Sequence, residues 1–179
     1  QASKQISNLL GLKNKGKIKK ISDLKDFYNI NYKAPCPLEN LINTDDKFDI
    51  CISTTALEHF TVDDIKKYLS DLKNVLNKNI LVSSIIDYSD HYSHTDKNIG
   101  ALNFLNYSEK EWKKFNNPYL FQNRLRHQDY KRIFEDCGYS IKKVFKGPPS
   151  RTVEKISEEF DAKNNETFVT WAYFLIRLK

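Results

Sequence analysis

The sequence lacks methionine altogether and is poor in glycine, and both shortages narrow what the chain can be. It begins with Gln1 and has no methionine in 179 residues, so we expect a processed, truncated or partly represented product. Its five glycines never form a G-x-G pair. The chain therefore offers no glycine-rich loop of the kind that cradles a cofactor through backbone N–H groups.

Long apolar runs and paired cysteines are also missing. No stretch of 18 apolar residues is present, so we expect no membrane span and no membrane partner. The amino end is polar and does not resemble a signal peptide. Three cysteines, widely spaced and odd in number, favour reduced thiols and a cytoplasmic protein.

Acidic residues are absent from the first 20 positions, which contain six lysines. The remaining 159 residues carry 23 basic and 23 acidic groups, so the net charge of +6 belongs to one end of the chain. A balanced body is a weak argument for a nucleic-acid groove, and a nucleic-acid partner is not expected. We interpret residues 1–29 as a lysine-rich helical start that is solvated or faces a partner.

Hydrophobic periodicity predicts alternating helices and strands after this start. The early elements are helices over 3–10 and 22–28, the latter capped by Ser22, and a strand over 30–34. A strand over 48–53, an amphipathic helix over 61–76 and a buried strand over 80–86 follow, with Thr61 and Asp64 placed as a capping pair. Two nearly all-apolar strands joined by a helix indicate a parallel βαβ unit.

The second half of the chain continues the same alternation. Helices are predicted over 108–115, 128–137 and 151–160, and strands over 140–146 and 167–178. Together with the first half they predict a single α/β domain over 30–179. An aromatic-rich insertion at about 87–126 interrupts this domain, and such insertions commonly form a substrate lid.

The stretch "FDICISTTALEHF" at residues 48–60 resembles the motif after the fourth strand of class I S-adenosylmethionine-dependent methyltransferases. The order of the downstream elements is similar too, with 80–86 as the fifth strand and 140–146 as the sixth. The resemblance implies a Rossmann-like, mostly parallel sheet whose last strand, 167–178, is antiparallel and inserts beside the fifth. "DHYSH" and "NRLR" further resemble a subgroup of bacterial small-molecule methyltransferases.

The resemblance implies S-adenosylmethionine as the cofactor. It places the cofactor's sulfonium along the segment Ser53, Thr54, Thr55, Ala56, Leu57 and Glu58. The family's glycine-rich loop and the acid that holds the ribose have no counterpart here. We therefore interpret the chain as the carboxyl-terminal portion of a methyltransferase that lacks the first βαβ unit, and expect it to bind the cofactor poorly or not at all by itself.

Candidate catalytic residues lie on loops that should leave the carboxyl ends of the parallel strands, where ligands bind in open α/β sheets. In "IIDYSDHYSHTD" at 85–96, His91 is our candidate base, with Asp87 or Asp90 orienting it. A polar loop is the alternative, and a metal site of His91, His94 and Asp96 is not favoured, so we expect no metal. His59 would face the substrate or anchor its loop, although Glu58 and His59 could simply cap the helix that follows.

Candidate substrate-binding residues come from two segments of the insertion. Tyr92 and His94 belong to the first loop. Asn123, Arg124 and Arg126 precede the helix predicted over 128–137, and arginines there could grip a phosphate or carboxylate. The structural alternative for Arg126 is pairing with Asp129, Glu135 or Asp136.

Three functional hypotheses remain. The first is methyl transfer to a hydroxyl or amine of a small molecule, such as a sugar or nucleotide sugar, for which His91→Ala should impair turnover far more than cofactor affinity. The second is a non-catalytic Rossmann-like remnant that acts as a binding or scaffold module. The third, an RNA methyltransferase, is disfavoured by the balanced charge. The sequence assigns no oligomeric state.

Overall fold

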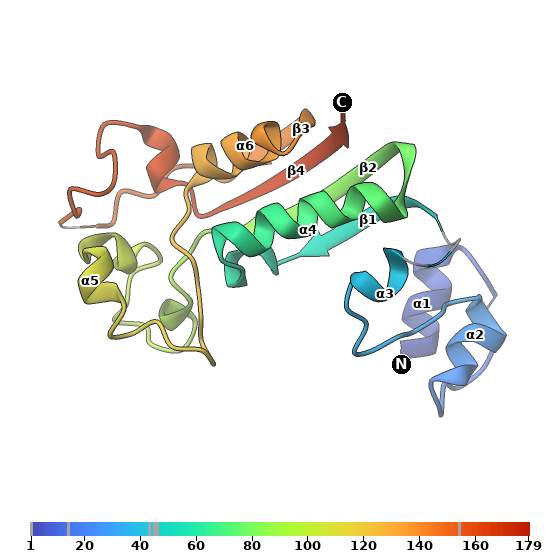
Figure 1. Cartoon of the computed structure of the whole chain (residues 1–179). Helices are drawn as coiled ribbons and strands as arrows, with labels where there is room; N and C mark the ends of the chain where they lie inside the picture. Colours follow the sequence, from blue (N-terminus) through green and yellow to red (C-terminus); the bar gives the residue numbers. More distant parts are fainter. Residues whose placement is uncertain (1, 14, 43, 45–46, 154) are drawn as a thin grey trace. The chain divides into compact units, whose positions relative to one another are not determined.

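The computed structural model describes residues 2–13, 15–42, 44, 47–153 and 155–179. The chain divides into two compact units, Gln1–Pro37 and Leu38–Lys179. Figure 1 labels the helices and strands of both units. No helix among the described residues is long and apolar enough to cross a membrane.

The first unit contains helices α1 (Ala2–Leu10) and α2 (Ser22–Tyr28), as predicted. The Ser7 and Tyr28 hydroxyls hydrogen-bond at 2.9 Å. Ser22 lies inside α2 and does not cap it, contrary to expectation. Instead the Asp23 carboxylate accepts the backbone N–H groups of Lys19 and Lys20, and these bonds lower its pKa. The strand predicted over 30–34 does not form, because no described strand pairs with it.

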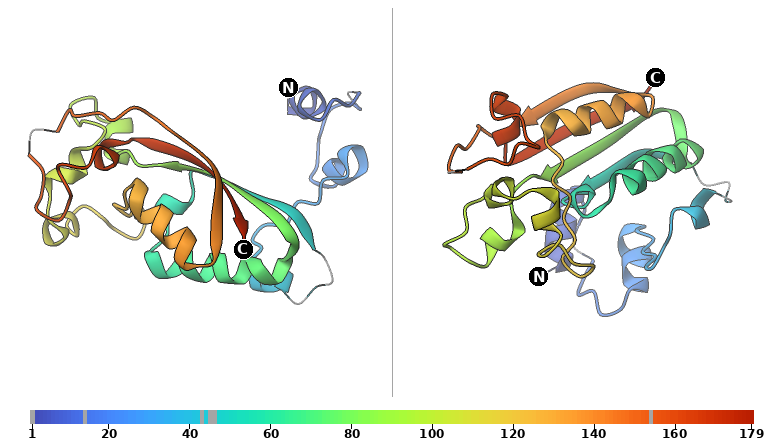
Figure 2. Two further views of the ribbon diagram at one scale, coloured as in Figure 1. Left: turned by 90° about the horizontal axis from the view of Figure 1, so that it is seen from above. Right: turned by 60° about the vertical axis from the view of Figure 1, so that its left-hand side comes forward.

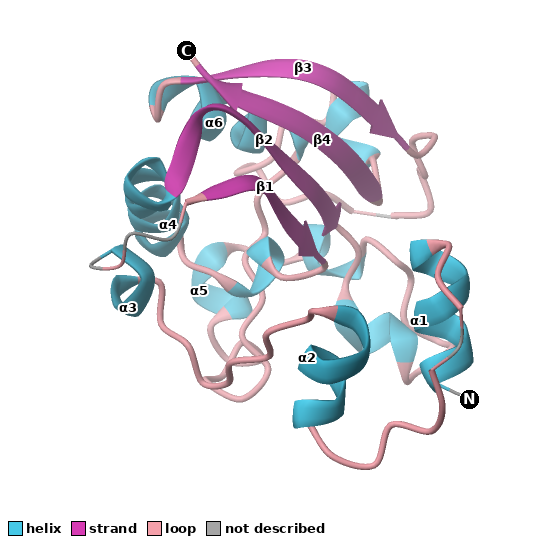
Figure 3. Cartoon of the chain, turned by 90° about the vertical axis from the view of Figure 1, so that its right-hand side faces the viewer, coloured by secondary structure: helices cyan, strands magenta, loops and turns pink. Residues whose placement is uncertain are grey.

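The second unit is built on a mixed four-stranded sheet (Figure 3). Its strands are β1 (Phe48–Thr54), β2 (Leu76–Asp87), β3 (Tyr139–Lys146) and β4 (Trp171–Leu178), in the order β1-β2-β4-β3. β1 is parallel to β2, and β4 is antiparallel to both β2 and β3. The antiparallel last strand therefore lies beside β2, as the sequence predicts, and the other three strands share one direction.

Helices α4 (Val62–Val75) and α6 (His127–Asp136) pack against the same face of this sheet (Figure 2). Ile65, Leu69 and Leu72 of α4 join Val82 of β2 and Phe174 of β4 in the main core, all at most 2% exposed. The predicted capping pair is present, since Thr61 and Asp64 form a reciprocal capping box. The short helix α3 (Glu39–Ile42) packs on α4.

The opposite face of the sheet keeps large apolar side chains in solvent. Ile50 and Ile52 of β1 are 50% and 69% exposed, and Ile85 of β2 is 39% exposed. Trp171 and Phe145, at 45% and 59%, extend this exposed row across β4 and β3. One-sided burial explains why the strands alternate between buried and exposed positions along β4.

A second, smaller core holds the insertion between β2 and α6. It gathers Leu102, Phe104, Leu105, Trp112 and Phe168, each at most 3% exposed. The short helices η2 (His91–His94), η3 (Asn103–Asn106) and α5 (Glu109–Trp112) lie in this insertion, and η4 (Asn165–Phe168) precedes β4. Phe104 and Trp112 of the aromatic-rich insertion thus fill a core, whereas Phe115 and Tyr119 are 42% and 96% exposed.

The helix predicted over 151–160 is absent from the described residues of that segment. Val153, Ile156 and Phe160 nevertheless pack on the second core. Their apolar surface is therefore covered from a loop, and this removes the need for an amphipathic helix. The helix predicted over 108–115 is shortened to α5, with Ser108 and Glu111 forming its capping box.

His127, at the start of α6, makes the stability of this unit dependent on pH. Its side chain is 1% exposed, its ring stacks on Phe174 at 5.1 Å, and burial lowers its pKa to about 4. The Glu166 carboxylate, 3.9 Å away, opposes that shift, whereas three nearby cations, Lys146, Lys131 and Arg126, reinforce it. His127 is therefore neutral in the folded chain at pH 6.

We expect acidification to destabilise the chain through His127. The unfolded chain takes up this proton below about pH 6.5 and the folded chain only near pH 4, so stability is lost as the pH falls between those values. His127→Gln should abolish roughly 2 kcal/mol of the loss between pH 7 and pH 5. Urea titrations of both proteins at the two pH values measure the difference, and identical pH slopes would contradict the assignment.

Candidate functional site

The carboxyl ends of β1 and β2 meet at one edge of the sheet, where Thr54 pairs with Ile85. The chain then turns sharply at Thr55, whose φ of 46° is left-handed and unusual for a β-branched residue. The Thr55 N–H donates to the Ile85 carbonyl at 2.9 Å. The turn leads into η1 (Leu57–His59), so residues 53–58 lie at the carboxyl edge of the parallel strands.

Glu58 is the most unusual residue of this turn. Its side chain is 1% exposed, and neither carboxylate oxygen makes a hydrogen bond of ordinary geometry. Burial raises its pKa to about 6, although the backbone N–H groups of Glu58 and Asp87 lower the pKa slightly. A buried acid without ordinary hydrogen bonds is costly, and its position next to a loop of histidines marks it as a candidate for chemistry.

His59 is held by the insertion. Its Nδ1 lies 2.8 Å from the Phe121 carbonyl oxygen. Since a carbonyl can only accept, Nδ1 carries the proton and the neutral ring leaves Nε2 as an acceptor. The ring centroid lies 5.0 Å from that of His91, so two loops far apart in sequence bring their imidazoles together.

Asp87, at the end of β2, lies between two histidines. Its Oδ2 is 3.7 Å from Nε2 of His91 and 3.6 Å from Nε2 of His94. Its Oδ1 accepts the N–H and the hydroxyl of Ser89 at 2.8 and 2.6 Å. His91 and His94 stack with their centroids 5.0 Å apart, and burial lowers the pKa of His91.

Asp90, the other acid proposed to orient His91, points elsewhere. Its carboxylate accepts the Tyr92 N–H at 2.9 Å and the Asn103 side-chain amide at 3.2 Å. Burial raises its pKa. Asp90 therefore caps η2, and of the two acids it is Asp87 that lies against the His91 ring.

Asn123 ties the turn after β1 to the segment before α6. Its side-chain nitrogen donates to the carbonyls of Leu57 and Phe60 at 2.9 and 2.8 Å. Its side-chain oxygen accepts the Leu125 N–H and the Tyr130 hydroxyl, both at 3.1 Å. The side-chain nitrogen and oxygen of Asn123, which were expected to contact a substrate, thus form their hydrogen bonds within the protein.

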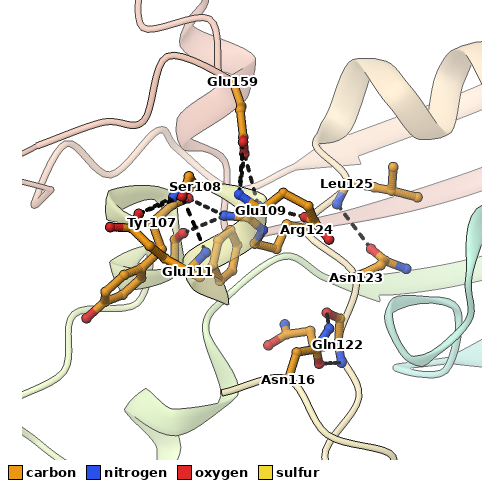
Figure 4. Close-up of polar contacts among 11 residues, drawn as sticks. Tyr107, Ser108, Glu109, Glu111, Asn116, Gln122, Asn123, Arg124, Leu125 and Glu159 are labelled. Carbon is orange, nitrogen blue, oxygen red and sulfur yellow. Dashed lines mark hydrogen bonds and ion pairs between the residues drawn. The ribbon is translucent and has the colours of Figure 1, made fainter. Parts of the chain in front are cut away.

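Arg124 and Arg126 are likewise engaged internally. The Arg124 guanidinium pairs with Glu109 and Glu159 at 2.8 and 3.1 Å (Figure 4). Arg126 is 2% exposed and donates to the backbone carbonyls of a set of three residues, Tyr88, Thr167 and Val169. Neither of these two arginines is therefore free for a substrate. The Arg126 guanidinium bonds to carbonyls and not to acids, although the Asp129 carboxylate accepts the Arg126 backbone N–H.

Tyr92 and Gln122 complete the support of the site. The Tyr92 hydroxyl donates to the Phe115 carbonyl at 2.8 Å, and its ring packs edge-on against Trp112. The Gln122 side chain donates to the Ser89 carbonyl and accepts the His91 N–H at 3.1 Å. Sequence reasoning missed Gln122, because a lone glutamine carries no motif and its partners are more than 30 residues away.

An open cavity of about 350 Å³ lies beside this cluster. Asp87, Ser89 and His94 line it from the β2 loop, and Thr55 lines it from the turn after β1. Ile85 and Trp171 supply an apolar wall. The cavity is therefore open to a small ligand that has both polar and apolar faces.

Among the described residues, one group could hold a metal ion. Glu58, His59 and His91 each offer one ligand atom, and these atoms lie within 4.8 Å of one another. The trio weighed from the sequence is different, and its Asp96 accepts the N–H and side-chain amide of Asn98. The candidate metal ligands in the structure therefore come from two loops, whereas those considered from the sequence come from one.

S-adenosylmethionine would find part of a pocket here. Ser53, Thr54, Thr55 and Ala56 are at least partly exposed and can form one wall, whereas Leu57 and Glu58 are buried and turned inward. None of the five glycines follows β1 or β2 directly. Residues 53–56 are therefore accessible to such a cofactor, and no glycine loop directly follows β1 or β2.

Solved structures of methyltransferases resemble this chain at low sequence identity. No family model and no curated protein matches it. A methyltransferase structure from Methanosarcina mazei is 11% identical, with TM-score 0.45 over 78% of this chain and 65% of that one. TehB from Haemophilus influenzae is 13% identical, with TM-score 0.46 over 89% of this chain and 45% of that one. A methyltransferase from Clostridium acetobutylicum is 15% identical, with TM-score 0.43 over 98% of this chain and 69% of that one.

The chain thus spans between 45% and 69% of the length of these three proteins. At such identities and TM-scores the similarity says nothing about activity. The sheet itself is the more direct evidence for the fold. Its strand order and its one antiparallel strand are those expected of the last four strands of a class I methyltransferase sheet. The chain has an α/β fold like that of class I S-adenosylmethionine-dependent methyltransferases.

Proposed function

We propose that this chain takes part in S-adenosylmethionine-dependent methyl transfer to a hydroxyl or amine of a small molecule. The observation that carries the proposal is the gathering of Asp87, His91 and His94 at the carboxyl edge of β1 and β2. Open α/β sheets bind ligands at this edge. The cavity beside the three side chains is of a size suited to a sugar-like acceptor.

The chemistry asks little of the protein beyond alignment. When bound, the cofactor supplies a methyl group on a positively charged sulfur, which keeps the electron pair as the carbon–sulfur bond breaks. The acceptor oxygen or nitrogen gains the methyl group and loses a proton. Asp87 faces the cavity with His94 beside it and is placed to receive that proton. Positioning of the acceptor within reach of the methyl group would account for most of the rate.

The proposal predicts weak binding of the cofactor along residues 53–58. Titration of S-adenosylhomocysteine into the ¹⁵N-labelled chain should shift the amide signals of residues 53–58 and leave those of α6 unchanged. Thr54→Arg places a bulky cation on the exposed wall and should weaken this binding about tenfold. The matched control Thr152→Arg lies on an exposed loop and should leave it unchanged.

Product formation completes the test. The chain is incubated with S-adenosylmethionine and, in turn, with free sugars, nucleotide sugars and aliphatic amines, and S-adenosylhomocysteine is measured by mass spectrometry. Asp87→Asn should reduce the product formed while the amide shifts of residues 53–58 persist. Absence of shifts at 53–58 at the solubility limit of the ligand, together with absence of product from every class of acceptor, would overturn the proposal and favour a non-catalytic binding module.

A further inference from the structure

Two buried polar groups next to each other lack hydrogen bonds of ordinary geometry. The Glu58 carboxylate oxygens and Nε2 of His91 are all buried without a hydrogen bond. Unpartnered buried groups are rare in proteins, and two on facing loops need a common explanation. A ligand that accepts electron pairs from both groups supplies one.

The His59 ring is oriented so that it could bind the same ligand. Its Nδ1–H is donated to the Phe121 carbonyl, which orients the ring and leaves the Nε2 electron pair available. Histidines that bind metals usually donate their second N–H to a carbonyl or carboxylate in this way. The Asp87 carboxylate, 3.7 Å from His91, adds negative charge next to the group.

We propose that Glu58, His59 and His91 bind one divalent transition-metal ion, for which Zn²⁺ is the probe. Two imidazoles and one carboxylate within 4.8 Å are a ligand set that zinc accepts at catalytic sites, with a position left open. Softer ions would prefer thiolates and Mg²⁺ would prefer oxygen ligands. The group contains two imidazoles and no thiolate among the described residues, so its ligand set favours Zn²⁺ over both.

The ion would lie at the end of β1, adjacent to the proposed acceptor cavity. If the proposed methyl transfer holds, on which this step rests, the open position would take the acceptor's oxygen and favour its deprotonated form. The favoured substrate would then be a hydroxyl compound rather than an amine. Metal binding itself requires only the three side chains and can be measured without any cofactor.

Calorimetric titration of Zn²⁺ into chelator-treated chain tests the site. We expect one ion per chain, and at least a tenfold loss of affinity in Glu58→Gln, His59→Ala and His91→Ala. The matched control is His94→Ala, because His94 stacks on His91 but is outside the set, and it should change affinity less than threefold. Co²⁺ should bind without a thiolate charge-transfer band, which excludes the three free cysteines.

Glu58→Gln separates metal binding from folding. It keeps the shape of the side chain and removes a buried, unpartnered carboxylate, so the metal-free variant should be at least as stable as the original chain. Stable variants that lose Zn²⁺ support the site. Failure to bind one ion, or an equal loss in His94→Ala and His59→Ala, would overturn it. Amide shifts with S-adenosylhomocysteine in the presence of chelator judge the proposed function separately.

Discussion

Replacing Arg126 with methionine is expected to lower the free energy of unfolding of residues 38–179 by about 3 kcal/mol or more. The guanidinium donates to three backbone carbonyls and is 2% exposed. Methionine fills a similar volume but leaves all three acceptors without a donor, at about 1 kcal/mol or more each. The pKa of Arg126 is lowered to about 10 by burial, so the group is charged at neutral pH.

Tryptophan fluorescence during urea titration measures the free energy of unfolding of residues 38–179. The chain has two tryptophans, Trp112 and Trp171, and both lie in residues 38–179. Arg132→Met on the exposed side of α6 is the matched control and should change stability by less than about 0.5 kcal/mol. Equal effects of the two substitutions would show that the carbonyl contacts contribute little.

Asn123→Ala should lower the free energy of unfolding by about 2 to 3 kcal/mol. It removes both donors to the turn after β1 and the acceptor of the Tyr130 hydroxyl. Tyr130 is fully buried, so its hydroxyl would lose its partner in the core. The turn that contains Glu58 and His59 would also lose its attachment, and we expect Zn²⁺ affinity to fall with stability.

Asn123→Asp distinguishes hydrogen bonding from packing. It keeps the two acceptor contacts but sets a negative charge against the Leu57 and Phe60 carbonyls, so it should destabilise more than Asn123→Ala. The exposed Asn98→Ala controls for the loss of an asparagine and should fall within about 0.5 kcal/mol of the original chain. An aspartate variant that matches the original in urea would refute the role assigned to the side-chain nitrogen.

Strong local patterns predicted most of the fold. The 3.6-residue period of α4, the apolar run of β2 and the glycine after α6 each specify an element without help from distant residues. The segments 30–34 and 151–160 failed because their outcome depends on partners. Among the described residues no strand pairs with the first segment, and the other segment covers the second core from a loop.

The candidate site was predictable only in part for the same reason. Asp87 and His91 are four residues apart, and the carboxyl edge of a parallel sheet is enough to propose them together. The approach of Glu58 and His59 to His91 depends on tertiary structure that no spacing reveals. Likewise, the roles of Asn123 and Arg126 are set by carbonyls at the other ends of long loops.

The attachment of Asn123 to the turn after β1 has a consequence for the order of folding. Its N–H donates to the Glu58 carbonyl and its side chain reaches Leu57, 66 residues earlier. Closing a loop of this length costs entropy before any contact repays it, so such contacts form late. Refolding followed by stopped flow should therefore recover the helical signal before the histidine cluster can capture Zn²⁺.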